Sequence, residues 1–243
     1  MENNKDYLEW LEKIIKDGME LKYVPMEMKN EYMCGAAVSN NCYALEYVPV
    51  ELKSRELCEL AVKQDVSGYA MAYVPEELKT KEFCEMAVLN DSYNLEYVPE
   101  EFKTYDMCLE GVENNGSSLE FVPIEMKTEE LCFVAVKNNG HAIDFVPKEL
   151  ITEELCFVAV KNNGHAIDFV PKELITKEMV DIAITNDIDT FIYIPDKYKT
   201  MEMCEMAVKD DACDWLLEDI PAEFQEELAQ KYDLYLEPKA KGR

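Results

Sequence analysis

Residues 128–151 read TEELCFVAVKNNGHAIDFVPKELI, and residues 152–175 repeat the same 24 letters without a change. Similar units extend in both directions, and nine of the ten prolines mark them at intervals of 24 or 26 residues: Pro25, Pro49, Pro75, Pro99, Pro123, Pro147, Pro171, Pro195 and Pro221. A fixed period of this length is typical of stacked repeat arrays, because one short unit cannot bury its apolar face alone.

Within one unit the residues predict a helix, a stop and a shorter helix. Thr128 is a suitable N-cap, since its hydroxyl can accept a hydrogen bond from a free first-turn amide. The apolar residues after it lie on one stripe of a helix of about 11 residues: Leu131, Cys132, Ala135 and Val136. Asn139 and Gly140 predict the stop, because both accept the left-handed conformation that often follows a helix. Ala142 to Val146 then suit a shorter helix, which Pro147 ends.

This pattern predicts an all-α fold, an α-solenoid of about nine stacked 24-residue helix–turn–short-helix repeats with degenerate capping helices. We expect a single repeat domain over residues 1–236, with a cap at 1–20, repeats at 21–221 and a second cap at 222–236. Residues 237–243 are expected to form a flexible tail. The two-residue insertions fall near Gly68 and near 213–215, where we expect loops.

Cysteines and aromatic residues keep step with the prolines. Seven cysteines lie nine residues after a proline: Cys34, Cys58, Cys84, Cys108, Cys132, Cys156 and Cys204. Stacked helices lie ~8–10 Å apart, whereas a disulfide needs Cα atoms within ~7 Å, so we expect buried free thiols. An aromatic row lies two residues before the proline, where we expect core side chains: Tyr23, Tyr47, Tyr73, Tyr97, Phe121, Phe145, Phe169 and Tyr193.

The net charge of the chain indicates which kind of partner it could bind. The chain has 51 acidic and 24 basic residues, a net charge of −27, which excludes attraction to nucleic-acid phosphates or anionic lipid and favours basic partners. No apolar stretch approaches the ~18 residues of a membrane span. The N-terminal MENNKDYLEW lacks the basic-then-apolar order of a signal peptide, so we expect a cytoplasmic protein.

Acidic residues also recur with the repeat. One set follows eight of the nine repeat prolines by two residues, and we expect it to pair with lysines two residues further on: Lys29, Lys53, Lys79, Lys103, Lys127 and Lys199. A second set, the acid row, precedes the proline by three residues and has few local counter-charges: Glu46, Glu96, Glu120, Asp144, Asp168 and Glu218. With this row, we predict partner contacts from residues peculiar to the duplicated units: His141, His165, Ile151 and Ile175.

The string A-V-K-x-N-G-x-A-I-x-F-V-P-x-E-L resembles a family of short tandem repeats known only as a domain of unknown function. The resemblance covers roughly residues 21–225. It implies a helical repeat fold and carries no activity that could be transferred to this chain.

The sequence contains no recognisable catalytic set. His141 and His165 are the only histidines, and one repeat spacing separates them too widely to share a zinc ion at ~2.0–2.1 Å per bond. HExxH, Gly-rich phosphate-loop and GxSxG motifs are absent. We therefore predict no enzyme activity, cofactor or metal. Ile151 and Ile175 replace the lysine found four residues after other prolines. They could extend the core or form a local apolar patch on the surface, and the sequence leaves both interpretations open.

These observations favour a protein–protein interaction module whose acidic surface binds a basic protein. In its sharper form, the protein is an anti-defence or immunity inhibitor that occludes the channel of a nucleic-acid-binding enzyme. The net charge of −27 over about nine units is about −3 per unit, or one charge per ~3.3 Å at ~10 Å per unit, half the density of duplex DNA. The alternatives are a structural spacer and, third, a carboxylate-based metal-dependent hydrolase.

Overall fold

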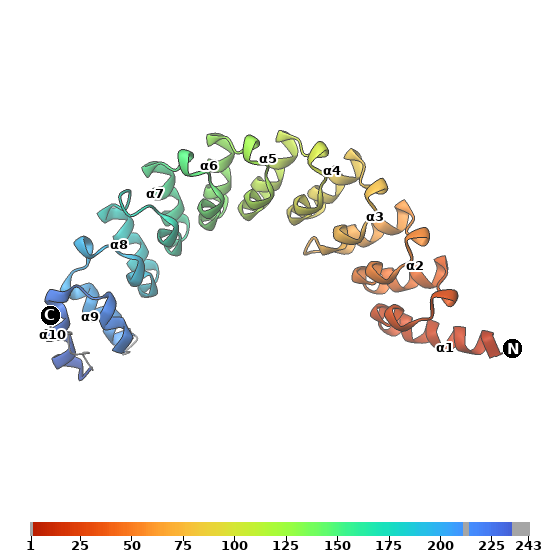
Figure 1. Ribbon diagram of the computed structural model, residues 1–243, viewed down its shortest axis with the longest axis horizontal. Helices are drawn as coiled ribbons and strands as arrows, with labels where there is room; N and C mark the ends of the chain where they lie inside the picture. The colour runs from red at the N-terminus through yellow and green to blue at the C-terminus, as the bar shows by residue number, and fades with distance from the viewer. Residues whose placement is uncertain (1, 211–213, 235–243) are drawn as a thin grey trace, which may run out of the picture. The chain divides into compact units, whose positions relative to one another are not determined.

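The computed structural model describes residues 2–210 and 214–234, which divide into two compact units, 1–127 and 128–243. All regular structure in the described residues is helical, which confirms the all-α solenoid. Each repeat contains an α-helix of about three turns, a 3₁₀ helix of five or six residues and, in most repeats, a three-residue 3₁₀ turn after the proline. Figure 1 shows the α-helices in chain order. Among the described residues, every helix is too short or too polar to cross a bilayer.

In the N-terminal unit the α-helices are α1 (Glu2–Lys16), α2 (Glu31–Asn40), α3 (Arg55–Gln64), α4 (Lys81–Asn90) and α5 (Tyr105–Asn114). The longer 3₁₀ helices are η1 (Gly18–Tyr23), η3 (Cys42–Tyr47), η5 (Tyr69–Tyr73), η7 (Ser92–Tyr97) and η9 (Gly116–Phe121). The short turns are η2 (Met26–Met28), η4 (Val50–Leu52), η6 (Glu76–Leu78), η8 (Glu100–Phe102) and η10 (Ile124–Met126).

In the C-terminal unit the α-helices are α6 (Glu129–Asn138), α7 (Glu153–Asn162), α8 (Lys177–Asn186), α9 (Met201–Asp210) and α10 (Ala222–Tyr232). The longer 3₁₀ helices are η11 (Gly140–Phe145), η13 (Gly164–Phe169), η14 (Ile188–Tyr193) and η16 (Asp214–Asp219). The short turns are η12 (Lys148–Leu150) and η15 (Asp196–Tyr198), whereas residues 172–174 form a turn without 3₁₀ geometry.

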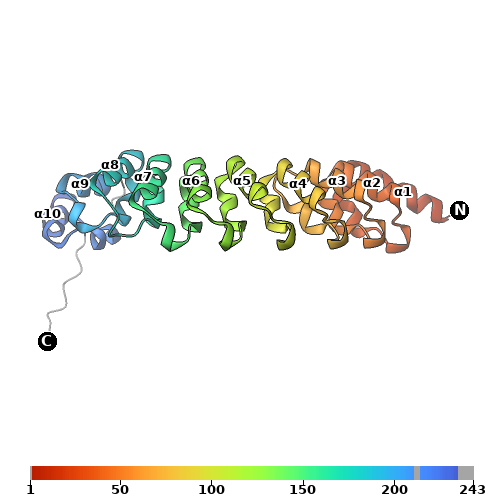
Figure 2. The same cartoon turned by 90° about the horizontal axis from the view of Figure 1, so that it is seen from above.

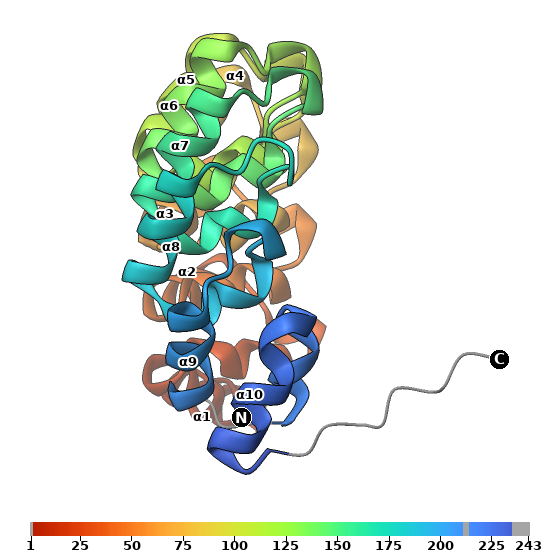
Figure 3. The ribbon, with the colours of Figure 1, turned by 90° about the vertical axis from the view of Figure 1, so that its left-hand side faces the viewer.

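Within each unit the repeats stack as two layers. Successive α-helices pack on one another, and successive long 3₁₀ helices pack on one another and on the α-layer. Figures 2 and 3 show the same helices from two further directions. The predicted helix stripe is confirmed in α6, where all four residues are fully buried: Leu131, Cys132, Ala135 and Val136. The seven cysteines that follow prolines by nine residues are buried free thiols, as predicted.

The predicted cap of the α-helix is confirmed, but the predicted stop works differently. Thr128 Oγ1 accepts a hydrogen bond from Leu131 N at 3.2 Å. Asn139, however, is extended (φ −140°, ψ 114°), and its side chain accepts a hydrogen bond from His141 N to start η11. Among the described residues only Gly68 and Asp233 have a left-handed φ. The stop is therefore a change from α to 3₁₀ geometry and not a left-handed cap.

Gly140 is required by the next repeat. A Cβ on this residue would lie 2.4 Å from the main-chain oxygen of Ala159 in α7. The close approach lets Gly140 N donate a hydrogen bond to Asn162 Oδ1 at 2.8 Å, while Asn162 Nδ2 donates to Lys137 O at 2.9 Å. We call this pair of bonds the asparagine clasp. It ties the end of one repeat's α-helix to the end of the next.

The predicted insertions and ends can be compared in part. Residues 65–68 form a loop before η5, and Gly68 has φ 76°, so the first insertion is a loop as expected. The second falls partly on residues 211–213, outside the described residues, and Asp214 begins η16. Helices α1 and α10 lie within the predicted caps, while 235–243 are outside the described residues. The single-domain boundaries stay a prediction.

Candidate interaction surface

The acid row lies on the long 3₁₀ helices and is exposed in both units. In the N-terminal unit its members are exposed on η3, η7 and η9: Glu46, Glu96 and Glu120. In the C-terminal unit they are exposed on η11, η13 and η16: Asp144, Asp168 and Glu218. In the part of the chain that the structure describes, no lysine, arginine or histidine forms an ion pair with any of these six carboxylates.

The aromatic row lies beside the acid row, and the prediction that it belongs to the core is wrong. Tyr23 is 63% exposed, and the other seven side chains are half-buried. The fully buried side chain comes two residues earlier, as Leu45 does before Tyr47. Residues three apart eclipse in a 3₁₀ helix, so Tyr47, the last residue of η3, lies on the side of the buried Ala44, while part of its larger ring stays exposed. The aromatic rings therefore form the edge of the surface that carries the acids.

The two rows influence each other electrostatically. Hydrogen bonding to the Glu46 carboxylate raises the pKa of Tyr47. Burial raises the pKa of Tyr73 and Tyr97, and the negative charges of Glu46 and Glu96 add to the effect. The raised pKa values keep these phenols neutral hydrogen-bond donors over a wide pH range.

The two histidines differ although their repeats are identical in sequence. The exposed His141 ring meets Phe169 edge-on, with centroids 6.0 Å apart. His165 is half-buried, and its Nε2 lies 3.0 Å from Asp187 Oδ2. Tyr93 meets Phe121 as His141 meets Phe169, with centroids 6.3 Å apart. Tyr93 and His141 thus contact the aromatic row, whereas His165 contacts a carboxylate. Among the described residues, no three His, Cys, Asp or Glu side chains form a group that could hold a metal ion.

Most of the lysines four residues after the prolines, the lysine row, do not pair with the acids two residues before them. In four of the six, Lys29, Lys53, Lys103 and Lys199, the ammonium group instead reaches a main-chain carbonyl in the next repeat. Nζ–O distances are 2.8 Å for Lys29 to Tyr47, 2.7 Å for Lys53 to Tyr73 and 3.0 Å for Lys103 to Phe121. Lys199 makes the same bond to Asp219 O. The lysine row therefore caps the 3₁₀ helices, whose last carbonyls lack internal partners.

Most of the lysine row is deeply placed. Lys79, Lys103 and Lys199 are 6–8% exposed, and burial lowers the pKa of Lys53. Where an acid stands three residues earlier, it pairs with the ammonium group, as Glu100 Oε1 does with Lys103 Nζ at 2.8 Å. The sequence held one clue to this role, since the residue four after the proline is a lysine in six repeats and otherwise Ile151, Ile175 or Gln225.

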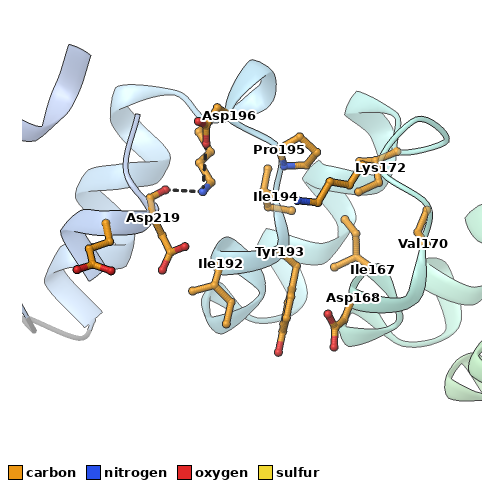
Figure 4. A pocket seen from close by; sticks show the side chains of 13 residues that line it. Ile167, Asp168, Val170, Lys172, Ile192, Tyr193, Ile194, Pro195, Asp196 and Asp219 are labelled. Atoms are coloured by element: carbon orange, nitrogen blue, oxygen red, sulfur yellow. Dashed lines mark hydrogen bonds and ion pairs between the residues drawn. The ribbon is translucent and has the colours of Figure 1, made fainter. Parts of the chain in front are cut away.

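The alternatives left open for the two isoleucines are resolved for Ile175 and stay open for Ile151. Ile175 is 2% exposed and therefore belongs to the core, whereas Ile151 is half-buried. Neither can cap the carbonyl that a lysine would reach. A cavity of about 550 Å³ lies beside Ile175, with Tyr193 in its wall (Figure 4).

Fold and surface together define an α-solenoid of short tandem repeats. The chain belongs to the family described as "Domain of unknown function (DUF4116)", whose profile matches residues 31–79, 54–103, 104–151, 128–175 and 152–199. No curated protein and no solved structure matches the chain.

Proposed function

We propose that the protein is a non-catalytic interaction module whose acid row binds a basic partner protein. The observation that carries this proposal is that six carboxylates at one position of the repeat are exposed and lack a cationic partner among the described residues. Other acids of the chain do have one, such as Glu59, which contacts both Arg55 and Lys63. Because the net charge is −27, the protein also attracts cationic groups that do not touch it, up to a distance of about one Debye length.

The chain itself illustrates how a lysine can lie on this surface. The Lys22 ammonium group is 5.8 Å from the ring centre of Tyr23 and 5.7 Å from that of Tyr47, two successive members of the aromatic row. Such cation–π contacts contribute about 0.5–1 kcal/mol at exposed sites. A basic partner would find the same aromatic faces next to the carboxylates. The partner favoured by this chemistry is a nucleic-acid-binding protein, because its channel is already built to hold regularly spaced negative charge.

A charge-reversal pair tests the proposal. The probe is a fluorescent peptide of alternating lysine and glycine, followed by anisotropy. The test variant changes Glu96, Glu120, Asp144 and Asp168 to lysine. The control changes the acids two residues after the prolines of the same repeats: Glu101, Glu125, Glu149 and Glu173. Because each variant replaces four acids by four lysines, both carry the same net charge.

We expect the acid-row variant to bind the peptide about tenfold more weakly than the control, a difference of about 1.4 kcal/mol. Wild-type binding should weaken between about 50 mM and about 500 mM salt. The inhibitor form of the proposal adds that the wild-type protein displaces duplex DNA from the peptide. Equal binding by the two variants would refute a specific acid row, and absence of binding by the wild type would favour the structural spacer.

A further inference from the structure

The C-terminal unit contains a cavity where the lysine row is interrupted. It has a volume of about 550 Å³, and Ile175, Ile192, Tyr193 and Ile194 contribute to its wall (Figure 4). All of its lining residues lie between Ile167 and Asp219, so it belongs to this unit alone. In three repeats that keep the lysine, those of Lys29, Lys53 and Lys103, the side chain at the position of Ile175 extends to the carbonyl of the next aromatic-row residue.

The carbonyl facing this vacancy is that of Tyr193. Each bond from a lysine-row ammonium group to a main-chain carbonyl runs from the residue four after one proline to the residue two before the next, as from Lys53 to Tyr73. By the same count Ile175 faces Tyr193 O, and both residues line the cavity. Tyr193 is the last residue of η14, so its carbonyl accepts no hydrogen bond within that helix. Among the described residues, no other group donates a hydrogen bond to it.

The local backbone also departs from the repeat here. Residues 172–174 form a turn without 3₁₀ geometry. In the preceding copy Ile151 N donates to Lys148 O at 3.3 Å, while the equivalent bond from Ile175 N to Lys172 O is not formed. Tyr198 instead donates its hydroxyl to Ile175 O at 2.8 Å. The identical sequences of the two copies therefore build different surroundings because their next repeats differ.

The cavity combines an apolar wall with an acidic lining. Ile192 occupies an acid-row position and is 38% exposed, so the apolar surface continues from the buried Ile175 to solvent. Four carboxylate residues line the cavity: Asp168, Asp196, Glu218 and Asp219. Two lysines line it as well, but Lys199 already pairs with Asp196 and caps Asp219 O. A long aliphatic side chain that ends in a positive charge fits both features.

We infer that this cavity receives a lysine side chain of the basic partner, with its methylene groups on the isoleucines and its ammonium group directed to Tyr193 O. The inference deepens the proposed function and rests on it. The same interaction occurs in other repeats, where a lysine ammonium group of the chain donates a hydrogen bond to the equivalent carbonyl. The partner's lysine would complete the pattern from outside.

Lys172 is the chain's own competitor for this place. It is exposed, forms no recorded hydrogen bond or ion pair, and extends toward Ile194 in Figure 4. At the same position two other repeats carry Glu76 and Glu100, whose carboxylates pair with a lysine ammonium group. A glutamate at 172 should therefore favour an incoming lysine.

The test compares three variants with the alternating lysine–glycine peptide and with its Nε-acetylated form. Ile175→Lys fills the cavity with the residue that other repeats carry, and we expect it to weaken binding of the unmodified peptide about tenfold. Ile151→Lys makes the same change of residue and charge in the identical copy, and we expect less than a twofold loss. Lys172→Glu should strengthen binding severalfold. Acetylation should abolish the difference between the first two variants.

The outcomes separate this inference from the proposed function. If the wild type binds the peptide and the two lysine variants lose affinity equally, the cavity is not the lysine site, while the acid-row proposal stands. If the wild type does not bind, both fail. Should Ile175→Lys melt at a lower temperature than the wild type, Lys172→Glu decides the matter, because its expected effect has the opposite sign and an unchanged affinity would overturn the inference.

Discussion

Replacing Gly140 by alanine is expected to lower the free energy of unfolding by about 3 kcal/mol. The added Cβ would lie 2.4 Å from the Ala159 main-chain oxygen, which cannot move aside as a flexible side chain could. Separating the two repeats would also stretch the asparagine clasp, in which Gly140 N and Asn162 Oδ1 are 2.8 Å apart. Overpacking and the weakening of a partly buried hydrogen bond thus act together at one position.

Gly35→Ala is the matched control for Gly140→Ala. A Cβ on Gly35, inside α2, meets nothing within 4 Å, so alanine there should stabilise the protein by about 0.5–1 kcal/mol through helix propensity. Urea unfolding followed by circular dichroism measures both variants. Because repeat proteins unfold in parts, amide exchange in α6 and α7 should show the Gly140 effect locally. Two variants that shift stability in the same direction would contradict this account.

The same geometry explains how far the sequence could predict the fold. The helix after Thr128 follows from local rules, since the capping hydroxyl and the apolar stripe belong to one segment. The reason for Gly140 does not, because the atom that excludes a Cβ belongs to Ala159 in the following repeat. A left-handed stop was the local explanation for Asn139 and Gly140, and the true constraint is contact between repeats.

The candidate surface shows the same division between local and non-local causes. Exposure of the acid row could be predicted, because unpaired acidic side chains such as Glu96 and Asp168 are almost never buried. The lysine row could not be placed from nearby charges alone, since the hydrogen-bond partner of Lys53 is the carbonyl of Tyr73 in the next repeat. The cavity at Ile175 is also lined by Ile192 and Tyr193 of the next repeat. Their position beside Ile175 follows from the stacking of the repeats and could not be predicted from the sequence.

Alkaline pH is expected to destabilise the fold strongly through its buried thiols. Burial raises the pKa of five cysteines from 9.0 to about 11: Cys58, Cys84, Cys108, Cys156 and Cys204. A raised pKa in the folded state means that the unfolded chain loses its protons first, so stability is complete below pH 9 and falls as the pH rises through 11. Each thiol should account for about 2 kcal/mol between about pH 8 and about pH 10.5.

One other buried group opposes this trend. Burial lowers the pKa of Lys53, so in its titration range the unfolded chain binds more protons and stability rises with pH. This is one group against five, and ionisation of the thiols adds negative charge to a chain that already carries −27. The net effect should therefore be a steep loss of the free energy of unfolding above pH 9.

Cys156→Val isolates the contribution of one thiol. The equivalent position of the next repeat is already a valine, the fully buried Val180, so the array accommodates this side chain. The variant should lose about 2 kcal/mol less than the wild type between about pH 8 and about pH 10.5, and adding Cys204→Val should roughly double the difference. The measurement is urea unfolding at each pH, with thiolate absorbance recorded in parallel. Because the comparison is between two pH values within each variant, any packing cost of valine cancels, and an identical pH dependence in all three proteins would show that thiol ionisation does not control the alkaline transition.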